Sequence, residues 1–90
     1  MREIIETAQF RRDYKKIASS GRASRSEFLT VVELLANDKV LPQKFRDHML
    51  TGEWKGYREC HIRPDWLLIY QKQDREIILV RTDSHNELFA

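Results

Sequence analysis

The hydrophobic pattern changes its period halfway along the 90-residue chain, and this change limits the possible folds more than any other feature. In the first half, the spacing of an amphipathic helix recurs in Phe10, Tyr14 and Ile17. In the second half, Trp66–Tyr70 is an unbroken apolar run, which favours a strand covered on both faces. The pattern therefore predicts helices first and strands afterwards.

Two helices are predicted from their starting signals. Thr7 is a suitable N-cap for a helix over residues 8–19. Ser24-x-x-Glu27 has the form of a capping box, in which the two side chains reciprocally satisfy free N–H groups, and a second helix follows to about Asn37. The apolar side chains that this second helix would bury are Phe28, Val31, Val32, Leu34 and Leu35. Two helices joined by a short turn indicate an α-hairpin.

Four strands are expected, and short polar turns connect the last three. Their ranges are 2–6, 54–62, 66–70 and 76–82, with turns at 63–65 and 71–75. Pro42 blocks a helix, so residues 38–53 are expected to be irregular. The order β-α-α-β-β-β predicts an α+β fold in which the α-hairpin packs on one face of a mostly antiparallel sheet, as a single domain over residues 1–90.

The single cysteine excludes an internal disulfide and a thiolate zinc cage, which fits a reducing compartment. Cys60 lies beside His61 within an expected strand, so the two side chains alternate faces and the thiol is expected in the core. No apolar run approaches the ~20 residues that span a bilayer. We therefore expect a cytoplasmic protein with no membrane partner.

Positive charge is concentrated near the N-terminus, although the formal net charge is only +2. The segment from Arg11 to Arg25 contains six basic side chains and a single acid, Asp13. Four of the basic residues lie off the apolar stripe of the first helix: Arg11, Arg12, Lys15 and Lys16. Such a face attracts polyanions, nucleic acid above all, although an ordinary solvated helix has the same composition.

The short turns require the last three strands to form a meander, and this topology brings distant residues together. The residues expected at one end of the sheet are His61, Asp65, Trp66, Arg81 and the following His85. Whether they share a face is open, because a one-residue slip in either hairpin would turn His61 away from Arg81. His48 would lie at the opposite end unless an extended loop carried it back by ~20 Å.

The converging side chains suit cleavage of an RNA phosphodiester. Histidine exchanges protons near neutral pH, the guanidinium of arginine matches phosphate oxygens, and aromatic rings stack on unpaired bases. RNA supplies its own nucleophile, the 2′-hydroxyl. The protein then needs only a base, an acid for the leaving 5′ oxygen and positive charge for the phosphorane.

The histidines and the aspartate also have structural interpretations. His48 is by default a polar loop residue, and His61 could be a strand histidine with satisfied hydrogen bonds. Alternatively, His48, His61 and His85 could be the three ligands of a zinc site, although their spacing is wide. Asp65 could simply hold its turn.

The arginine and the aromatic residues allow the same ambiguity. Arg81 could form a structural ion pair with Glu59 or Asp83. Trp54, Trp66 and Tyr70 fit a core better than a platform for bases. Phe89, close to the end of the chain, is harder to explain as a core residue.

Two segments of the second half carry a specific pattern: Asp47-His48-x-Leu50-x-Gly52-x-Trp54-Lys55-Gly56-Tyr57-Arg58-Glu59-x-His61-Ile62-x-Pro64-Asp65-Trp66-Leu67-Leu68-Ile69-Tyr70, and Arg81-Thr82-x-Ser84-His85-x-x-Leu88-Phe89. This pattern closely resembles the YafQ toxins of the RelE/ParE superfamily, which belong to bacterial type II toxin–antitoxin systems. The resemblance extends over nearly the whole chain in length and element order, while the N-terminal helices match only in type. It implies a RelE-like fold.

The resemblance also implies an activity and partners. Such toxins are ribosome-dependent endoribonucleases, or mRNA interferases, that cut translated mRNA in the A site of the 70S ribosome and use no metal or other cofactor. A cognate antitoxin of the DinJ kind neutralises them, and the toxin–antitoxin complex usually represses its own operon. Operator DNA would therefore be bound only through the complex.

The resemblance assigns roles to individual residues. It implies that His85 donates the proton to the leaving oxygen, that His48 or Asp65 is the base at the 2′-hydroxyl, and that Arg81 and His61 stabilise the phosphorane. The implied substrate contacts are Trp66, Phe89 and Lys55. The basic face formed by Arg11, Arg12, Lys15 and Lys16 suits the backbone of ribosomal RNA.

Other classes of function remain as alternatives. A ParE-like protein of the same superfamily would poison DNA gyrase without catalysis, but this leaves the histidines unexplained. A metal-dependent hydrolase would use the three histidines as ligands. A purely structural or regulatory partner of an antitoxin is the fourth possibility, and intact chemistry at the matched positions argues against it.

Overall fold

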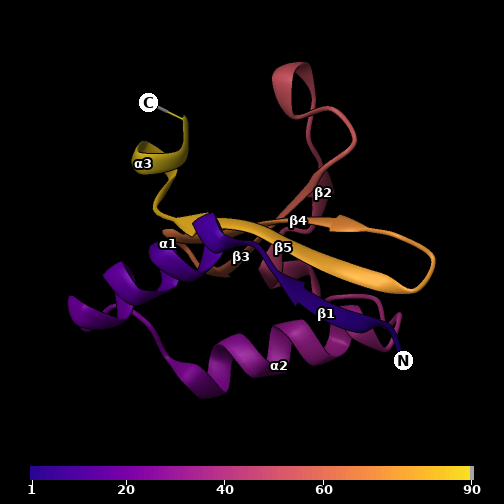
Figure 1. Cartoon of the computed structure of the whole chain (residues 1–90), viewed down its shortest axis with the longest axis horizontal. Coiled ribbons are helices and arrows are strands. Elements are labelled where there is room, and N and C mark those ends of the chain that lie inside the picture. The colour runs from indigo at the N-terminus through magenta and orange to yellow at the C-terminus, as the bar shows by residue number, and fades with distance from the viewer. Residues whose placement is uncertain (90) are drawn as a thin grey trace.

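Five strands form one mixed sheet in the order β1-β5-β4-β3-β2 (Figure 1). The strands are β1 (Glu3–Glu6), β2 (His48–Met49), β3 (Arg58–Arg63), β4 (Trp66–Lys72) and β5 (Glu76–Asp83). The computed structural model describes residues 1–89. β1 pairs with β5 in parallel, and every other pairing is antiparallel because short turns join β3, β4 and β5. The predicted, mostly antiparallel α+β architecture is confirmed.

The two long helices begin where their capping residues predict. The Thr7 hydroxyl accepts the N–H of Phe10 at 3.0 Å at the start of α1 (Ala8–Ser19). The Ser24 hydroxyl accepts the N–H of Glu27 at 3.3 Å at the start of α2 (Arg25–Ala36). The reciprocal half of the predicted capping box is wrong, since the carboxylate of Glu27 instead accepts Arg63 Nε at 2.6 Å. One side-chain oxygen is enough to start α2.

The α-hairpin covers one face of the sheet, as predicted. Its buried contributions to the core are Phe10 and Ile17 from α1 and Phe28, Val31, Val32 and Leu35 from α2. The sheet contributes Cys60, Ile62, Trp66, Leu68, Tyr70, Ile77 and Leu79. Since burying one large apolar side chain contributes about 1.5–3 kcal/mol, this shared core holds the helices and the sheet together.

Three connecting segments differ from the sequence predictions. Residues 38–53, expected to be irregular, contain a 3-10 turn (η1, Gln43–Phe45) and the two-residue strand β2. The strand expected from residue 54 begins only at Arg58, because a second 3-10 turn (η2, Gly52–Trp54) precedes it and Gly56 adopts a φ of 95°. The last residues form a short helix, α3 (His85–Phe89), on the side of the sheet away from α2 (Figure 1).

Candidate active site

Two histidines share one buried carboxylate on the face of the sheet opposite the α-hairpin. His48 in β2 lies directly opposite Glu59 in β3, and His61 lies two residues further along β3. Glu59 Oε1 is 3.6 Å from His48 Nε2 and 3.3 Å from His61 Nε2. The Glu59 side chain is only 6% exposed. The loop through η2 therefore carries the chain back so that β2 places His48 beside His61, which the sequence left open.

The second nitrogen of each imidazole also faces an oxygen. His61 Nδ1 donates to the carbonyl of Pro64 at 3.1 Å, and His48 Nδ1 donates to the carbonyl of Arg46 at 2.7 Å. A neutral imidazole has only one N–H, whereas the imidazolium has two. In the cluster of His48, Glu59 and His61, each imidazole therefore lies between the Glu59 carboxylate and a backbone carbonyl, and these contacts orient both rings.

A polar anchor beside this cluster fixes β2 to the sheet. The Asp47 carboxylate, next to His48, accepts Arg58 Nη2 at 3.1 Å and the Tyr70 hydroxyl at 2.5 Å. Burial, together with the hydrogen bond to Asp47, raises the pKa of the Tyr70 hydroxyl, so Tyr70 stays a neutral donor. The anchor explains why a strand of only two residues holds His48 in place.

The turn between β3 and β4 reaches the short helix α3. Asp65 Oδ1 accepts the backbone N–H of His85 at 3.2 Å, and the Ser84 hydroxyl accepts that of Glu87 at 3.3 Å. These bonds cap α3 and fix the position of His85. Its ring is exposed and lies 5.2 Å, centroid to centroid, from the half-buried ring of Phe89. Asp65 thus does more than hold its turn.

Arg81 projects from the same sheet face as the histidine cluster. Glu59 and Arg81 both lie opposite Ile69, one on each side of it, and directly opposed residues share a face. The register therefore places Arg81 on the same face of the sheet as Glu59 and His61. Arg81 Nε donates to Asp13 Oδ2 at 2.7 Å. The structural ion pair considered for Arg81 exists, but its partner is Asp13 of α1 rather than Glu59 or Asp83.

One member of the predicted ribosome-binding face on α1, Lys16, also forms ion pairs within the protein, although its side chain is 54% exposed. The ammonium of Lys16 lies 3.2 Å from Asp83 and 3.4 Å from Glu87, and these hydrogen bonds raise the pKa of Lys16. Lys16 therefore ties α1 to the end of β5 and to α3. The other three predicted side chains, Arg11, Arg12 and Lys15, are exposed on the outer face of α1.

The predicted substrate contact by Trp66 needs correction. Its side chain is 3% exposed, its indole N–H donates to the Thr82 hydroxyl at 2.9 Å, and its ring belongs to the core. No ring face is free for an RNA base, so we assign Trp66 to the core. Phe89 is half-buried next to His85, and Lys55 is exposed after η2, so both stay accessible to a substrate.

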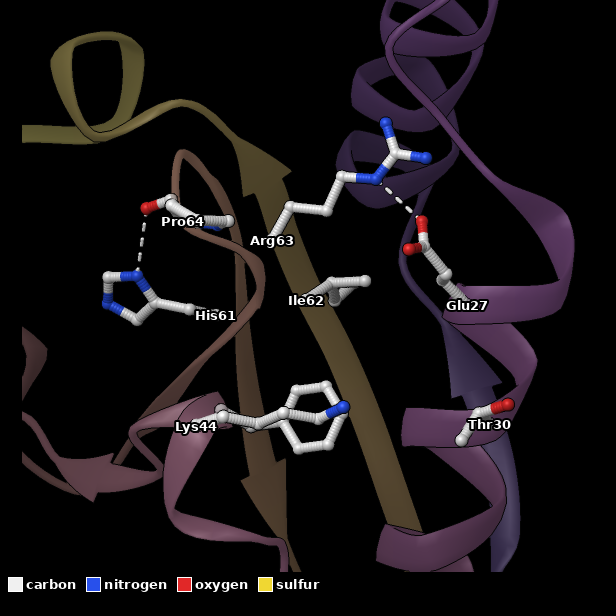
Figure 2. Close-up of a pocket in the computed structure, with 8 residues that line it drawn as sticks. Glu27, Thr30, Lys44, His61, Ile62, Arg63 and Pro64 are labelled. Atoms are coloured by element: carbon white, nitrogen blue, oxygen red, sulfur yellow. Dashed lines mark hydrogen bonds and ion pairs between the residues drawn. The ribbon is translucent and has the colours of Figure 1, made fainter.

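A hollow of about 400 Å³ lies on the flank of His61 towards α2 (Figure 2). Phe45 and Ile62 supply apolar surface, and Lys44 and Arg63 supply positive charge. Figure 2 shows the imidazole of His61 pointing away from this hollow, towards Pro64. The hollow therefore adjoins the histidine cluster without containing it.

The thiol of Cys60 lies in the core, as predicted, and burial raises its pKa, which leaves it a poor nucleophile.

Within residues 1–89, no group of three or more His, Cys, Asp or Glu side chains is arranged to hold a metal ion. The three histidines divide accordingly: His48 and His61 meet at Glu59, and His85 stands on α3. The same described residues contain no helix that is both long and apolar enough to cross a membrane.

Sequence reasoning missed two acids that organise this site. Glu59 precedes His61 by two residues in a strand, so a carboxylate and an imidazole on one face could have been read from that spacing. Asp13 follows Phe10 by three residues and precedes Ile17 by four, which places it on the buried face of α1. An acid at an apolar position of a basic helix is a signal for a buried ion pair.

Comparisons with known proteins identify the family of this chain. The family model described as "Bacterial toxin of type II toxin-antitoxin system, YafQ" matches residues 2–90. The mRNA interferase toxin YafQ of Escherichia coli is 37% identical over 90 residues, which cover 99% of this chain and 97% of the relative.

Two solved structures share the fold. A metal-bound toxin from Helicobacter pylori superposes with a TM-score of 0.92 at 38% identity, covering 99% of this chain and 100% of the other. The toxin in the E. coli DinJ-YafQ toxin-antitoxin complex superposes with a TM-score of 0.89 at 36% identity, covering 99% of this chain and 98% of the other.

Proposed function

Since this chain belongs to the YafQ family of bacterial type II toxins, we propose that it is a ribosome-dependent endoribonuclease that cuts translated mRNA and so inhibits growth. One observation carries the proposal: His48 and His61 share the buried carboxylate of Glu59 on the sheet face from which Arg81 also projects. Cleavage through a phosphorane needs proton-transfer groups and positive charge, and this sheet face carries both.

The first step is attack by the 2′-hydroxyl of the RNA on the adjacent phosphorus. We assign His48 as the base, because the Glu59 carboxylate beside it can stabilise the imidazolium that forms when the ring takes the proton. Asp65 is the weaker candidate, since one of its oxygens already accepts the backbone N–H of His85. His61, held by the same carboxylate, would supply a second positive group next to the phosphorane.

The second step breaks the bond from phosphorus to the 5′ oxygen. His85 gives its proton to this leaving oxygen, so the products are a 2′,3′-cyclic phosphate and a 5′-hydroxyl. Arg81 neutralises the extra negative charge of the phosphorane. Phe89, beside His85, offers an aromatic ring to an unpaired base, and the exposed ammonium of Lys55 offers charge to the RNA backbone.

The exposure of these groups supports the proposed dependence on the ribosome. The imidazole of His48 is 49% exposed, and His85 lies exposed on a helix of only five residues. Such a site supplies chemistry but few contacts that would align a flexible RNA, and alignment contributes strongly to rate. The ribosome would provide this alignment in its A site, while Arg11, Arg12 and Lys15 bind ribosomal RNA.

The partners follow from the family. The relative in the E. coli structure is bound to DinJ, and we propose a DinJ-like antitoxin for this chain. Operator DNA would be contacted only through the toxin–antitoxin complex. The proposed place of action is the cytoplasm, where translated mRNA is found, with no membrane partner.

The reaction is proposed to need no metal, and this has a direct test. The chelator-treated protein is incubated with ribosomes programmed with a defined mRNA, and the 5′ ends of the products are mapped. We expect cuts in register with codons, full activity after chelation, and no cleavage when translation is blocked. Activity that returns only with added metal would support a metal-dependent hydrolase instead, and inhibition of purified DNA gyrase would support the ParE-like alternative.

A further inference from the structure

Asp13 is the single acid in a segment with six basic side chains, and it is buried. It lies on the same face of α1 as Phe10 and Ile17, and only 5% of its surface is exposed. A carboxylate is rarely buried without a partner, because removing it from water is unfavourable. Its position therefore requires an explanation that the proposed reaction does not supply.

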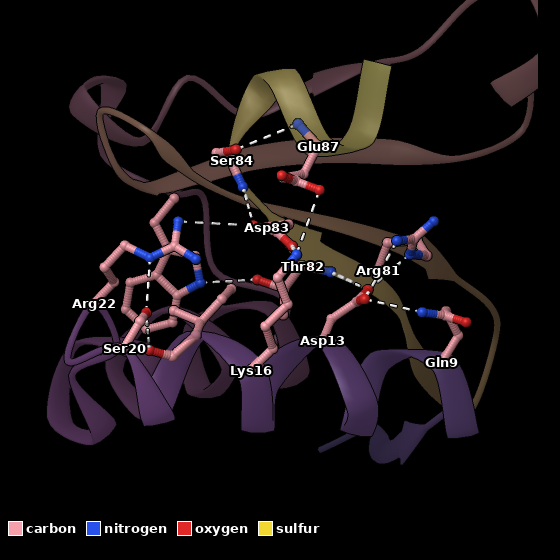
Figure 3. A network of polar contacts seen from close by, with 12 residues as sticks. Gln9, Asp13, Lys16, Ser20, Arg22, Arg81, Thr82, Asp83, Ser84 and Glu87 are labelled. Atoms are coloured by element: carbon pink, nitrogen blue, oxygen red, sulfur yellow. Dashed lines mark hydrogen bonds and ion pairs between the residues drawn. The ribbon is translucent and has the colours of Figure 1, made fainter. Parts of the chain in front are cut away.

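Four hydrogen bonds satisfy the Asp13 carboxylate (Figure 3). Arg81 donates from Nε at 2.7 Å and from Nη2 at 3.3 Å, the backbone N–H of Thr82 donates at 3.2 Å, and Gln9 Nε2 donates at 2.9 Å. Burial opposes ionisation of Asp13, but these donors outweigh it and lower its pKa. The hydrogen bond that Arg81 donates to Asp13 raises the pKa of Arg81 in turn. The pair is therefore charged.

The geometry leaves part of the guanidinium free. Asp13 takes the edge formed by Nε and Nη2, and the Arg81 side chain is still 30% exposed. A guanidinium has five N–H groups, so Nη1 and the remaining N–H of Nη2 can still hold two phosphate oxygens. One edge of Arg81 is anchored in the protein, and the other is available to a ligand.

We propose that Asp13 is a positioning residue that holds Arg81 in the orientation needed to bind the scissile phosphate. This inference rests on the proposed function, in which Arg81 stabilises the phosphorane. An unanchored arginine has several rotatable bonds and would reach the phosphate only in a fraction of its conformations. If the guanidinium is anchored before substrate arrives, a larger fraction of the protein molecules is ready to bind the phosphate, as electrostatic preorganisation requires.

The docking of α1 does not depend on Asp13 alone, which makes the inference testable. Asp83 is held by Lys16, one turn beyond Asp13 in α1, at 3.2 Å, and by Arg22, in the loop after α1, at 3.8 Å (Figure 3). The Thr7 hydroxyl also donates to the carbonyl of Val80 at 3.0 Å. A variant that changes only Asp13 keeps these contacts, which hold α1 and its two flanking residues, Thr7 and Arg22, against β5.

The test compares Asp13→Asn, Arg81→Ala, the double variant and Ile17→Val in cleavage of mRNA on programmed ribosomes. Asp13→Asn is expected to lower kcat at least ~10-fold, because misplacing a charged group by about 1 Å has effects of this size. In the Arg81→Ala background the same change should alter the rate less than about 2-fold, since both residues act through one contact. Ile17→Val is the control, because it weakens the α1 core without touching Arg81.

A second variant and a spectroscopic measurement separate positioning from folding. Asp13→Glu keeps the charge but adds a methylene that displaces the guanidinium, so kcat of the folded protein should fall although the negative charge is retained. The Nε–H signal of Arg81 in an NMR spectrum should be sharp in the wild type and in Ile17→Val, and broadened in Asp13→Asn. This signal is read without substrate, so it tests the anchoring even in a protein that does not cleave.

The outcomes distinguish this inference from the function on which it rests. A wild-type protein that leaves ribosomal mRNA intact would overturn the proposed function. If the wild type cleaves and Asp13→Asn cleaves equally fast, only the role of Asp13 is overturned. An equal loss of rate from Asp13→Asn with and without Arg81 would also overturn it, because the effect would then not pass through the guanidinium.

Discussion

Glu59 Oε1 lies 3.3 Å from His61 Nε2, and this carboxylate is almost completely buried. The same oxygen approaches His48 at 3.6 Å, so one acid orients two imidazoles from two strands. Because directly paired strand residues share a face, the arrangement is a consequence of the β2–β3 register. The proton transfer proposed for this site would therefore depend on a residue that need not touch RNA.

Glu59→Gln should lower the cleavage rate about 10–100-fold, as expected when an outer carboxylate that orients a functional histidine is lost. The amide keeps the shape of the side chain but cannot stabilise an imidazolium. The measurement is kcat on programmed ribosomes. Glu33→Gln is the matched control, since Glu33 is an exposed carboxylate on α2, outside the cluster. A wild-type rate in Glu59→Gln would show that the two histidines need no orienting acid.

His85→Ala should abolish growth inhibition but leave the fold and antitoxin binding intact. Its imidazole is exposed, and the bond to Asp65 uses the backbone N–H, which alanine retains. The free energy of unfolding should change by less than about 0.5 kcal/mol. Induction in cells measures toxicity, and co-purification with antitoxin measures binding, with the neighbouring Asn86→Ala as control. A His85→Ala protein that still arrests growth would remove His85 from the mechanism.

Trp66→Phe should destabilise the protein without changing the specific activity of the folded fraction. The substitution removes the N–H bond to Thr82 inside the core, at a cost of about 1–2 kcal/mol. Phe89→Ala should instead lower the cleavage rate and leave stability nearly unchanged, since its ring is only half-buried and lies beside His85. Urea unfolding and the ribosome assay are run on both. Lost cleavage in a stable Trp66→Phe protein would contradict the core assignment.

Local signals in the sequence predicted the helices and the meander, and non-local contacts explain what was missed. Thr7 and Ser24 cap their helices with bonds to residues only three positions away, so their effect is visible in a short window. The pair of Asp13 and Arg81 spans 68 positions and leaves no pattern in either neighbourhood. Such a contact becomes apparent only when α1 and β5 are packed together.

The same reasoning applies to the short elements. β2 is two residues long. At the start of α3, the backbone N–H of His85 donates a hydrogen bond to Asp65, which lies 20 positions earlier. Isolated segments of this length are not stable in water, so their sequences carry little propensity. The placement of His61, Asp65 and His85 at one end of the sheet was nevertheless predictable, because a meander with short turns brings these strand ends together.

Charge reversal on α1 should weaken ribosome binding without changing the chemistry. In the triple variant Arg11→Glu, Arg12→Glu, Lys15→Glu, KM should rise, kcat at saturation should persist, and the salt dependence of binding should become shallower. Lys16→Glu is expected to differ, because it places a third carboxylate beside Asp83 and Glu87 and destabilises the fold. Full toxicity of the triple variant at elevated salt would contradict the assignment.

The contribution of Asp13 to stability should disappear in acid. Its pKa in the folded protein lies below the ordinary value of 3.8, so the unfolded chain binds the proton more tightly. The stabilisation is therefore complete above pH about 5 and is lost as the pH falls through the folded-state pKa. At pH 7, Asp13→Asn should lower the free energy of unfolding by about 2 kcal/mol, as for a buried hydrogen bond to a charged group.

The check is urea unfolding of the wild type and of Asp13→Asn at pH 7, 5, 4 and 3. Taking the difference between the two proteins cancels the titration of the other acids, so the remaining change reports the Asp13–Arg81 pair. We expect the gap to close as the pH decreases, because both proteins then carry a neutral side chain at position 13. A gap that stayed constant from pH 7 to 3 would mean that Asp13 stabilises the fold through its shape rather than its charge.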